Sequence, residues 1–120
     1  MESENTYDFI CGTTLIWEFN VSEIKETNQK IRRKLKYYKL GDFDQYRIDY
    51  LRSMKNELKA EIQLYQKSKY FKKSKKSKYA DYADYDIEIM VSDFVGKYEK
   101  ISKSDMYGII NYAIYLYYLR

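Results

Sequence analysis

The chemistry open to this chain is limited first by the reactive side chains that it lacks. The sequence contains no histidine and a single cysteine, Cys11. A Ser–His or Cys–His nucleophile pair therefore cannot form within it. Its four glycines are dispersed and match no phosphate-binding or dinucleotide-binding motif. We expect a non-enzymatic protein with no catalytic residues and no cofactor.

A group of acidic residues after position 80 is the carboxylate cluster to consider for a metal ion. Calcium loops need a ligand spacing and a central glycine that this stretch lacks. Acids are also favoured at helix N-termini by the helix dipole, and the sequence favours that role over metal binding. We therefore predict no metal site. The acids are Asp81, Asp84, Asp86 and Glu88.

A lysine-rich segment, residues 67–78, carries seven lysines interleaved with aromatic side chains. Lysines neutralise phosphates and aromatic rings stack on bases, so the segment is a candidate for non-specific nucleic-acid binding. The alternatives are that it meets an acidic protein partner, which we favour, or that it keeps the chain solvated. The lysines expected to steer an acidic partner are Lys72, Lys73, Lys75 and Lys76. The upstream bases that could extend the patch are Arg32, Arg33, Lys34 and Lys36.

Tyrosine is abundant, with sixteen in 120 residues, and three tyrosines recur at a spacing of three: Tyr79, Tyr82 and Tyr85. On a helix this spacing places the rings along one stripe. Tyrosine offers a large rigid contact area together with a hydroxyl group, which suits a protein interface. We expect these rings to anchor a protein partner. The alternative is that they close one end of the core.

The first secondary-structure element that the sequence predicts spans residues 7–21. Apolar and polar residues alternate there around Gly12, which predicts a β-hairpin with Leu15, Trp17 and Phe19 facing the core. Residues 22–66 carry two helical stripes separated by a short connection at Gly41, which predicts an antiparallel helical hairpin. Residues 67–78 would form a basic connector.

Residues 79–120 predict two further helices, the second capped by Ser104 and apolar almost all round. Such a helix is a buried one, so we expect it at the centre of a small core; a homodimer formed through it is also left open. Together these elements predict one domain, residues 1–120, of a mostly α (α+β) fold in which a β-hairpin packs on about four helices.

Targeting signals are not evident. The N-terminus is acidic where an export signal is basic, and the single cysteine fits a reducing compartment. The apolar run 106–119 falls short of the about 20 residues that a bilayer crossing needs. We expect a cytoplasmic protein without membrane contact.

The overall character of the chain resembles that of accessory proteins of phages infecting low-GC bacteria: short, proline-free and rich in Lys and Tyr, with its charges in blocks. In length and in its predicted hairpin, residues 22–41 and 42–66, it is similar to small phage anti-defence inhibitors, among them a Bacillus-phage inhibitor of a sirtuin-domain defence NADase. The resemblance implies stoichiometric occlusion of a host protein in the host cytoplasm, without turnover. The rival function is non-specific nucleic-acid binding through residues 67–78.

Overall fold

The computed structural model describes residues 5–72 and 80–120, and the regular elements in these two ranges are helical. The α-helices are α1 (Tyr7–Ile16), α2 (Ile24–Tyr38), α3 (Gln45–Ile62), α4 (Ile87–Lys97) and α5 (Lys103–Ile114). Short 3₁₀ turns are η1 (Val21–Glu23), η2 (Tyr65–Lys67) and η3 (Tyr82–Asp84), and a π-helical turn, η4 (Tyr115–Leu119), follows α5. The predicted mostly helical class is confirmed.

Helix α1 occupies the segment in which the sequence predicted a β-hairpin, and the described residues contain no strand, only an isolated bridge between Phe71 and Tyr85. The hydroxyl group of Thr6 starts the helix by accepting a hydrogen bond from the backbone N–H of Phe9 at 3.1 Å. The helix is buried on most of its circumference. A segment apolar on all sides has no helical period to detect, so its chance alternation suggested a strand.

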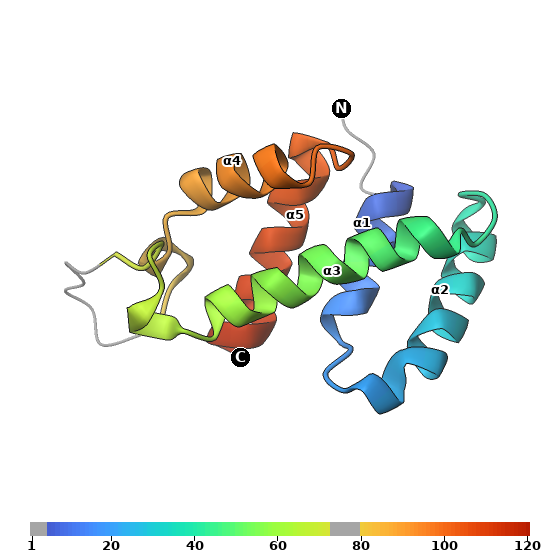
Figure 1. The fold of residues 1–120 in the computed structure, drawn as a ribbon, viewed down its shortest axis with the longest axis horizontal. Helices are drawn as coiled ribbons and strands as arrows, with labels where there is room; N and C mark the ends of the chain where they lie inside the picture. The colour runs from blue at the N-terminus through green and yellow to red at the C-terminus, as the bar shows by residue number, and fades with distance from the viewer. Residues whose placement is uncertain (1–4, 73–79) are drawn as a thin grey trace.

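Helices α2 and α3 follow each other closely, as predicted, but α1 lies in the angle between them (Figure 1). Helix α2 ends where Lys39 adopts a left-handed conformation, at φ 56°. The carboxylate of Asp44 then caps α3 by accepting from the N–H of Arg47. Because α2 packs chiefly on α1, the two helices do not form the simple hairpin that the sequence predicted.

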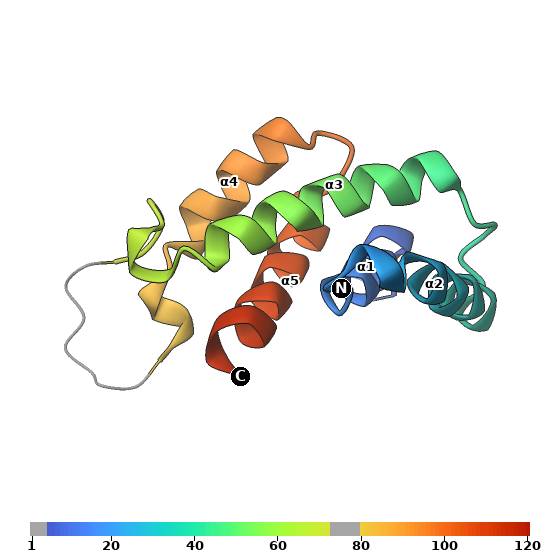
Figure 2. The same ribbon diagram turned by 60° about the horizontal axis from the view of Figure 1, so that its bottom comes forward.

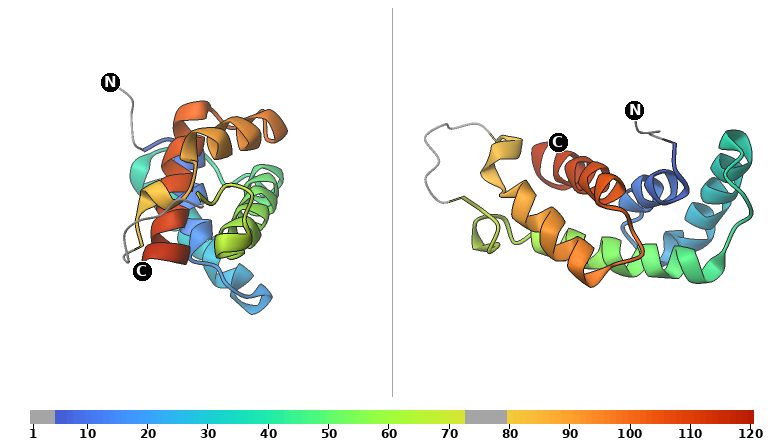
Figure 3. Two further views of the ribbon diagram at one scale, coloured as in Figure 1. Left: turned by 90° about the vertical axis from the view of Figure 1, so that its left-hand side faces the viewer. Right: turned by 90° about the horizontal axis from the view of Figure 1, so that it is seen from above.

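Helix α5 lies at the centre of the fold, as expected from its apolar composition. It contacts α1, α3 and α4, and Figure 3 shows α5, α1 and α2 in succession along α3. It begins two residues earlier than predicted, because the hydroxyl group of Ser102, not that of Ser104, accepts from the N–H of Asp105. The buried residues of α5 are Met106, Ile109, Ile110, Ala113 and Ile114. This apolar face is therefore covered within the chain.

Two glycines let α1 and α5 approach closely. A β-carbon added at Gly12 would lie 2.6 Å from Cδ1 of Ile109, and one added at Gly108 would lie 2.8 Å from Cε1 of Phe9. Each helix therefore offers a notch to a side chain of the other. A hydrogen bond of 2.7 Å from the hydroxyl group of Thr6 to the carboxylate of Asp105 closes one end of the contact.

A buried group of charged side chains links the segment that follows α1 to helix α3. The carboxylate of Glu18 accepts two hydrogen bonds from the guanidinium of Arg52, at 2.8 and 3.0 Å. The ammonium of Lys55 donates to the backbone oxygen of Glu18 at 3.0 Å. Burial alone would raise the pKa of Glu18, but the hydrogen bonds from Arg52 hold it below its ordinary value. Burial lowers the pKa of Lys55 despite the neighbouring carboxylate.

The helices enclose a core in a body measuring 46 × 35 × 23 Å, elongated along α3 (Figure 2). Within the described ranges, no helix combines the length and the apolar character that a membrane crossing requires.

Candidate functional site

The residues predicted to bind a partner divide between described and undescribed parts of the chain. Tyr79, Lys73, Lys75 and Lys76 lie outside the described residues. Lys72 is exposed, and its backbone N–H donates to the backbone oxygen of Asp84 at 2.7 Å. The basic connector can therefore be followed only at its first residues.

Of the predicted tyrosine stripe, the two described members, Tyr82 and Tyr85, do not share an exposed face. Tyr85 is only 1% exposed, and its hydroxyl group donates to the backbone oxygen of Ile62 at 2.6 Å. Its ring packs edge-on against those of Phe71 and Tyr118. Tyr82 is 38% exposed in η3. The prediction of Tyr85 as a surface anchor is wrong, because a short 3₁₀ turn and an extended residue replace the expected helix and turn this ring into the core.

The acidic cluster serves local structure. Asp81 accepts from the N–H of Ala83, and Asp86 accepts from the N–H of Ile89 at the start of α4. Asp84 is buried and accepts from the hydroxyl group of Tyr118 at 2.5 Å. In the part of the chain that the structure describes, no three metal-binding side chains come together.

Three aromatic rings and an arginine form a surface cluster, which we call the aromatic patch, where the end of α1 meets α5 and η4. It consists of Trp17, Tyr112, Tyr115 and Arg120. The indole N–H of Trp17 donates to the hydroxyl group of Tyr112 at 2.6 Å. The ring of Tyr115 lies 6.3 Å from that of Tyr112, and the guanidinium of Arg120 lies 5.0 Å from the indole centre. Trp17 and Tyr115 are each 43% exposed.

The outer face of α2 presents a second surface, which is basic. Six bases and no acid occur between positions 30 and 39, and all six are exposed. Five side chains line a surface hollow of about 310 Å³: Lys30, Arg33, Lys34, Tyr37 and Tyr38. Lys34 donates to the hydroxyl group of Thr14 at 3.1 Å, and its pKa is lowered by partial burial and by the nearby charge of Lys30.

A smaller hollow of about 260 Å³ lies between the two surfaces. Trp17 borders it on one side, and Lys30 and Lys34 border it on the other. The carboxylate of Glu26 also lines it and pairs with Lys30 at 3.5 Å. The aromatic patch and the basic face of α2 are therefore neighbours on one side of the molecule.

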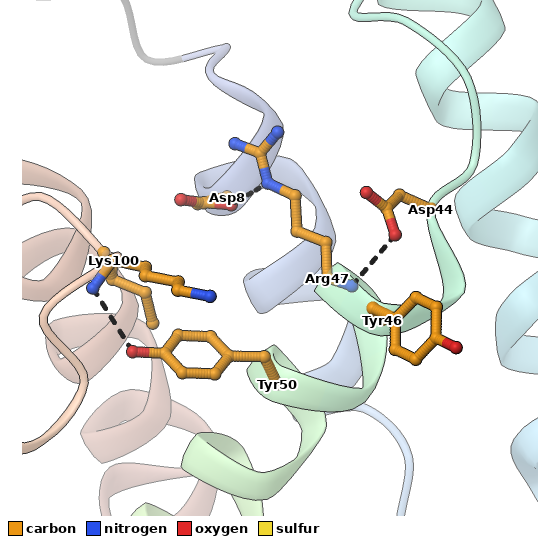
Figure 4. Close-up of a pocket in the computed structure, with 7 residues that line it drawn as sticks. Asp8, Asp44, Tyr46, Arg47, Tyr50 and Lys100 are labelled. Atoms are coloured by element: carbon orange, nitrogen blue, oxygen red, sulfur yellow. Dashed lines mark hydrogen bonds and ion pairs between the residues drawn. The ribbon is translucent and has the colours of Figure 1, made fainter.

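A third hollow, of about 550 Å³, opens between α1, α3 and the segment before α5 (Figure 4). Arg47 reaches from α3 across to α1, where its Nε donates to the carboxylate of Asp8 at 2.9 Å. The hydroxyl group of Tyr50 accepts from the backbone N–H of Lys100 at 3.2 Å. In this hollow Asp44 caps α3 and Asp8 pairs with Arg47, so these side chains have structural roles.

Sequence reasoning missed the aromatic patch. Trp17 was expected in the core, and its partner Tyr112 lies 95 positions away in the chain. No local pattern could have joined them. The bases of α2, in contrast, were visible as a run. Comparison of the chain with protein-family models, with curated proteins and with solved structures found no match.

Proposed function

We propose that this chain is a non-enzymatic binding protein that inhibits a host macromolecule, specifically a defence protein, by stoichiometric occlusion, and that the aromatic patch is its docking site. The observation that carries the proposal is the composition of the patch. Tryptophan, tyrosine and arginine are the residues in which binding energy concentrates at protein interfaces. Here a Trp, two Tyr and an Arg gather at the surface, although an ordinary surface places such side chains singly.

Preorganisation strengthens this role. The hydrogen bond between Trp17 and Tyr112 fixes two large side chains before any partner arrives. Ordering a flexible side chain in an interface costs about 0.5–1.5 kcal/mol, and side chains already held avoid that loss. The patch is thus arranged to bind without rearrangement.

The arrangement of the rings favours a protein over a nucleic acid at this patch. Bases stack on open ring faces. Arg120 lies over the indole of Trp17, and Tyr112 packs beside it, so the rings of the patch cover one another. A protein partner can contact their exposed edges and hydroxyl groups. A standard interface covers about 800 Å² on each side, roughly a tenth of the 7906 Å² surface of this chain.

The test is partner capture by tagged protein from host lysate, with and without nuclease treatment. We expect a stoichiometric, nuclease-resistant protein band that Tyr115→Ala removes while leaving the helical circular dichroism and the melting temperature unchanged. Tyr46→Ala is the matched control, because Tyr46 is 89% exposed and lies on α3, outside the patch. Capture should survive this change.

Four results would refute the proposal. Capture that is unaffected by Tyr115→Ala would remove the patch from the interface. A band that disappears with nuclease would replace the protein partner with a nucleic acid. Conversion of a substrate by the purified chain above background would show an enzyme. A purified chain of twice the monomer mass that dissociates on Tyr115→Ala would assign the patch to self-association instead.

A further inference from the structure

We infer that the outer face of α2 binds single-stranded nucleic acid, with Arg33 and Lys34 contacting phosphates and Tyr37 stacking on a base. This inference is independent of the protein partner proposed above. It concerns a different helix, and it places the contact on α2 and not on residues 67–78.

The first support is uncompensated charge. The six bases of this stretch are Lys30, Arg32, Arg33, Lys34, Lys36 and Lys39. Within residues 5–72 and 80–120, only Lys30 among them forms an ion pair, with Glu26. The guanidinium of Arg32 lies over the ring of Phe43, 3.9 Å from its centre. A row of exposed cations in which a single member is paired with an acid attracts a polyanion, and binding gains free energy by releasing counterions.

The second support is the shape of the surface. Lys30, Arg33, Lys34 and Tyr37 are spaced three, four and seven residues from the first, so they share one face of α2. They border the hollow of about 310 Å³ described above. Helix α2 lies at one end of the molecule, where α1 covers its inner side and no other described helix stands beyond it (Figure 3). A strand can therefore run along the helix unobstructed.

The third support is the aromatic side chain at the end of this row. Tyr37 is 79% exposed, far more than any ring of the aromatic patch. The ring of Tyr38 meets it at 90°, with centres 4.9 Å apart, so the pair is held by an edge contact and is not stacked. Most of Tyr37 is open to solvent, and an exposed ring beside cations is the arrangement on which unpaired bases stack.

The chemistry of the face favours nucleic acid over an acidic protein. The centres of protein interfaces are apolar and depleted in charge. The aliphatic residues Ile31 and Leu35 of α2 are buried against the core, so its outer face presents bases and two tyrosine rings and has no aliphatic centre. Interfaces with nucleic acids are polar and strongly positive. Partial burial is the main cause of the lowered pKa of Lys34, and the nearby charge of Lys30 lowers it further.

The experiment measures fluorescence anisotropy of a labelled oligothymidylate of about 16 nucleotides, titrated with the full chain between about 50 and 200 mM salt. Arg33→Gln/Lys34→Gln should weaken binding and make the slope of log affinity against log salt shallower by about 1.4, since each phosphate contact on a single strand contributes about 0.7. Tyr37→Ala should weaken binding at least about fivefold. A duplex of the same length should bind more weakly than the single strand and should not respond to Tyr37→Ala.

Two control variants locate the contact. Lys100→Gln/Lys103→Gln removes the same charge before and at the start of α5, away from α2, and should leave the salt slope unchanged. Lys73→Gln/Lys75→Gln/Lys76→Gln removes lysines of residues 67–78, and the Arg33 and Tyr37 effects should persist in this background.

Several outcomes would overturn the inference. Binding lost in the Lys73/Lys75/Lys76 variant and unchanged in the Arg33/Lys34 variant would move the contact to residues 67–78. An equal loss of affinity in the Lys100/Lys103 control would show that binding depends on net charge and not on the face of α2. Displacement of the oligonucleotide by polyglutamate at equal charge, together with a silent Tyr37→Ala, would identify an acidic polypeptide as the ligand.

Discussion

Replacing Gly12 by alanine tests the close contact between α1 and α5, on which the core depends. The new methyl group would lie 2.6 Å from Cδ1 and 3.0 Å from Cγ1 of Ile109. Ile109 is fully buried, so it cannot swing into solvent to make room. The side chain must leave its rotamer or the helices must separate.

The size of the effect follows from two opposing terms. Overpacking a filled core costs about 1–3 kcal/mol. Alanine in place of glycine gains about 1 kcal/mol of helix propensity. Gly96→Ala in α4 should gain the helix propensity without any overpacking cost, because an added β-carbon there has no atom within 4 Å. The free energy of unfolding of Gly12→Ala should therefore lie about 1–3 kcal/mol below that of Gly96→Ala.

Urea denaturation followed by circular dichroism measures both variants, with Gly96→Ala expected above the unmodified chain. Adding Ile109→Val to Gly12→Ala removes the clashing Cδ1 atom, and the double-mutant cycle should show a favourable coupling between the two sites. If Gly12→Ala stabilised the chain as much as Gly96→Ala does, the close approach of α1 and α5 would be wrong.

Three further predictions concern buried polar groups. Glu18→Gln should lower the free energy of unfolding by about 3 kcal/mol, because it removes the carboxylate that Arg52 and Lys55 share. Lys55→Met should lower it by about 1 kcal/mol or less, because Glu18 keeps its hydrogen bonds with Arg52. Equal losses for the two variants in urea denaturation would contradict this. The pKa of Glu18 is lowered on folding from 4.5, so its contribution is present above about pH 4.5 and is lost as pH falls through the folded value, and Glu18→Gln should flatten the acid limb of the stability curve. Burial raises the pKa of Cys11 to about 12, so a thiol reagent at pH 8 should label the native chain no faster than it unfolds, and rapid labelling before unfolding would show the thiol to be accessible.

Much of the helical framework follows from periodicity in the sequence. The stripes that predicted the second and third helices include Ile31 and Leu35 on α2 and Leu51 and Leu58 on α3, all of them buried. The N-terminal segment could not be assigned in this way. Helix α1 is covered by α2, α3 and α5, so its exposed face is too narrow to leave a polar stripe.

The candidate surfaces were predictable to different degrees. The basic face of α2 is a continuous run, so its charge, including Arg33 and Lys34, is evident from the residues alone. The aromatic patch depends on chain geometry: Trp17 reaches the surface because α1 is a helix that ends just before it. The burial of Tyr85 likewise depends on an extended residue after η3, which no spacing rule predicts.

The bonds that fasten α1 have an implication for the order in which the protein acquires its structure on the ribosome. They reach to Asp105, Tyr112 and Tyr117, between 95 and 101 positions ahead of their partners. The side of α1 that α5 covers must therefore stay exposed until almost a hundred later residues have been synthesised, although α2 and α3 can pack on its other sides earlier. Contacts so distant in sequence slow folding, and apolar surface that stays exposed favours aggregation and chaperone binding. Nascent chains of this protein should be bound by holdases until α5 has cleared the exit tunnel.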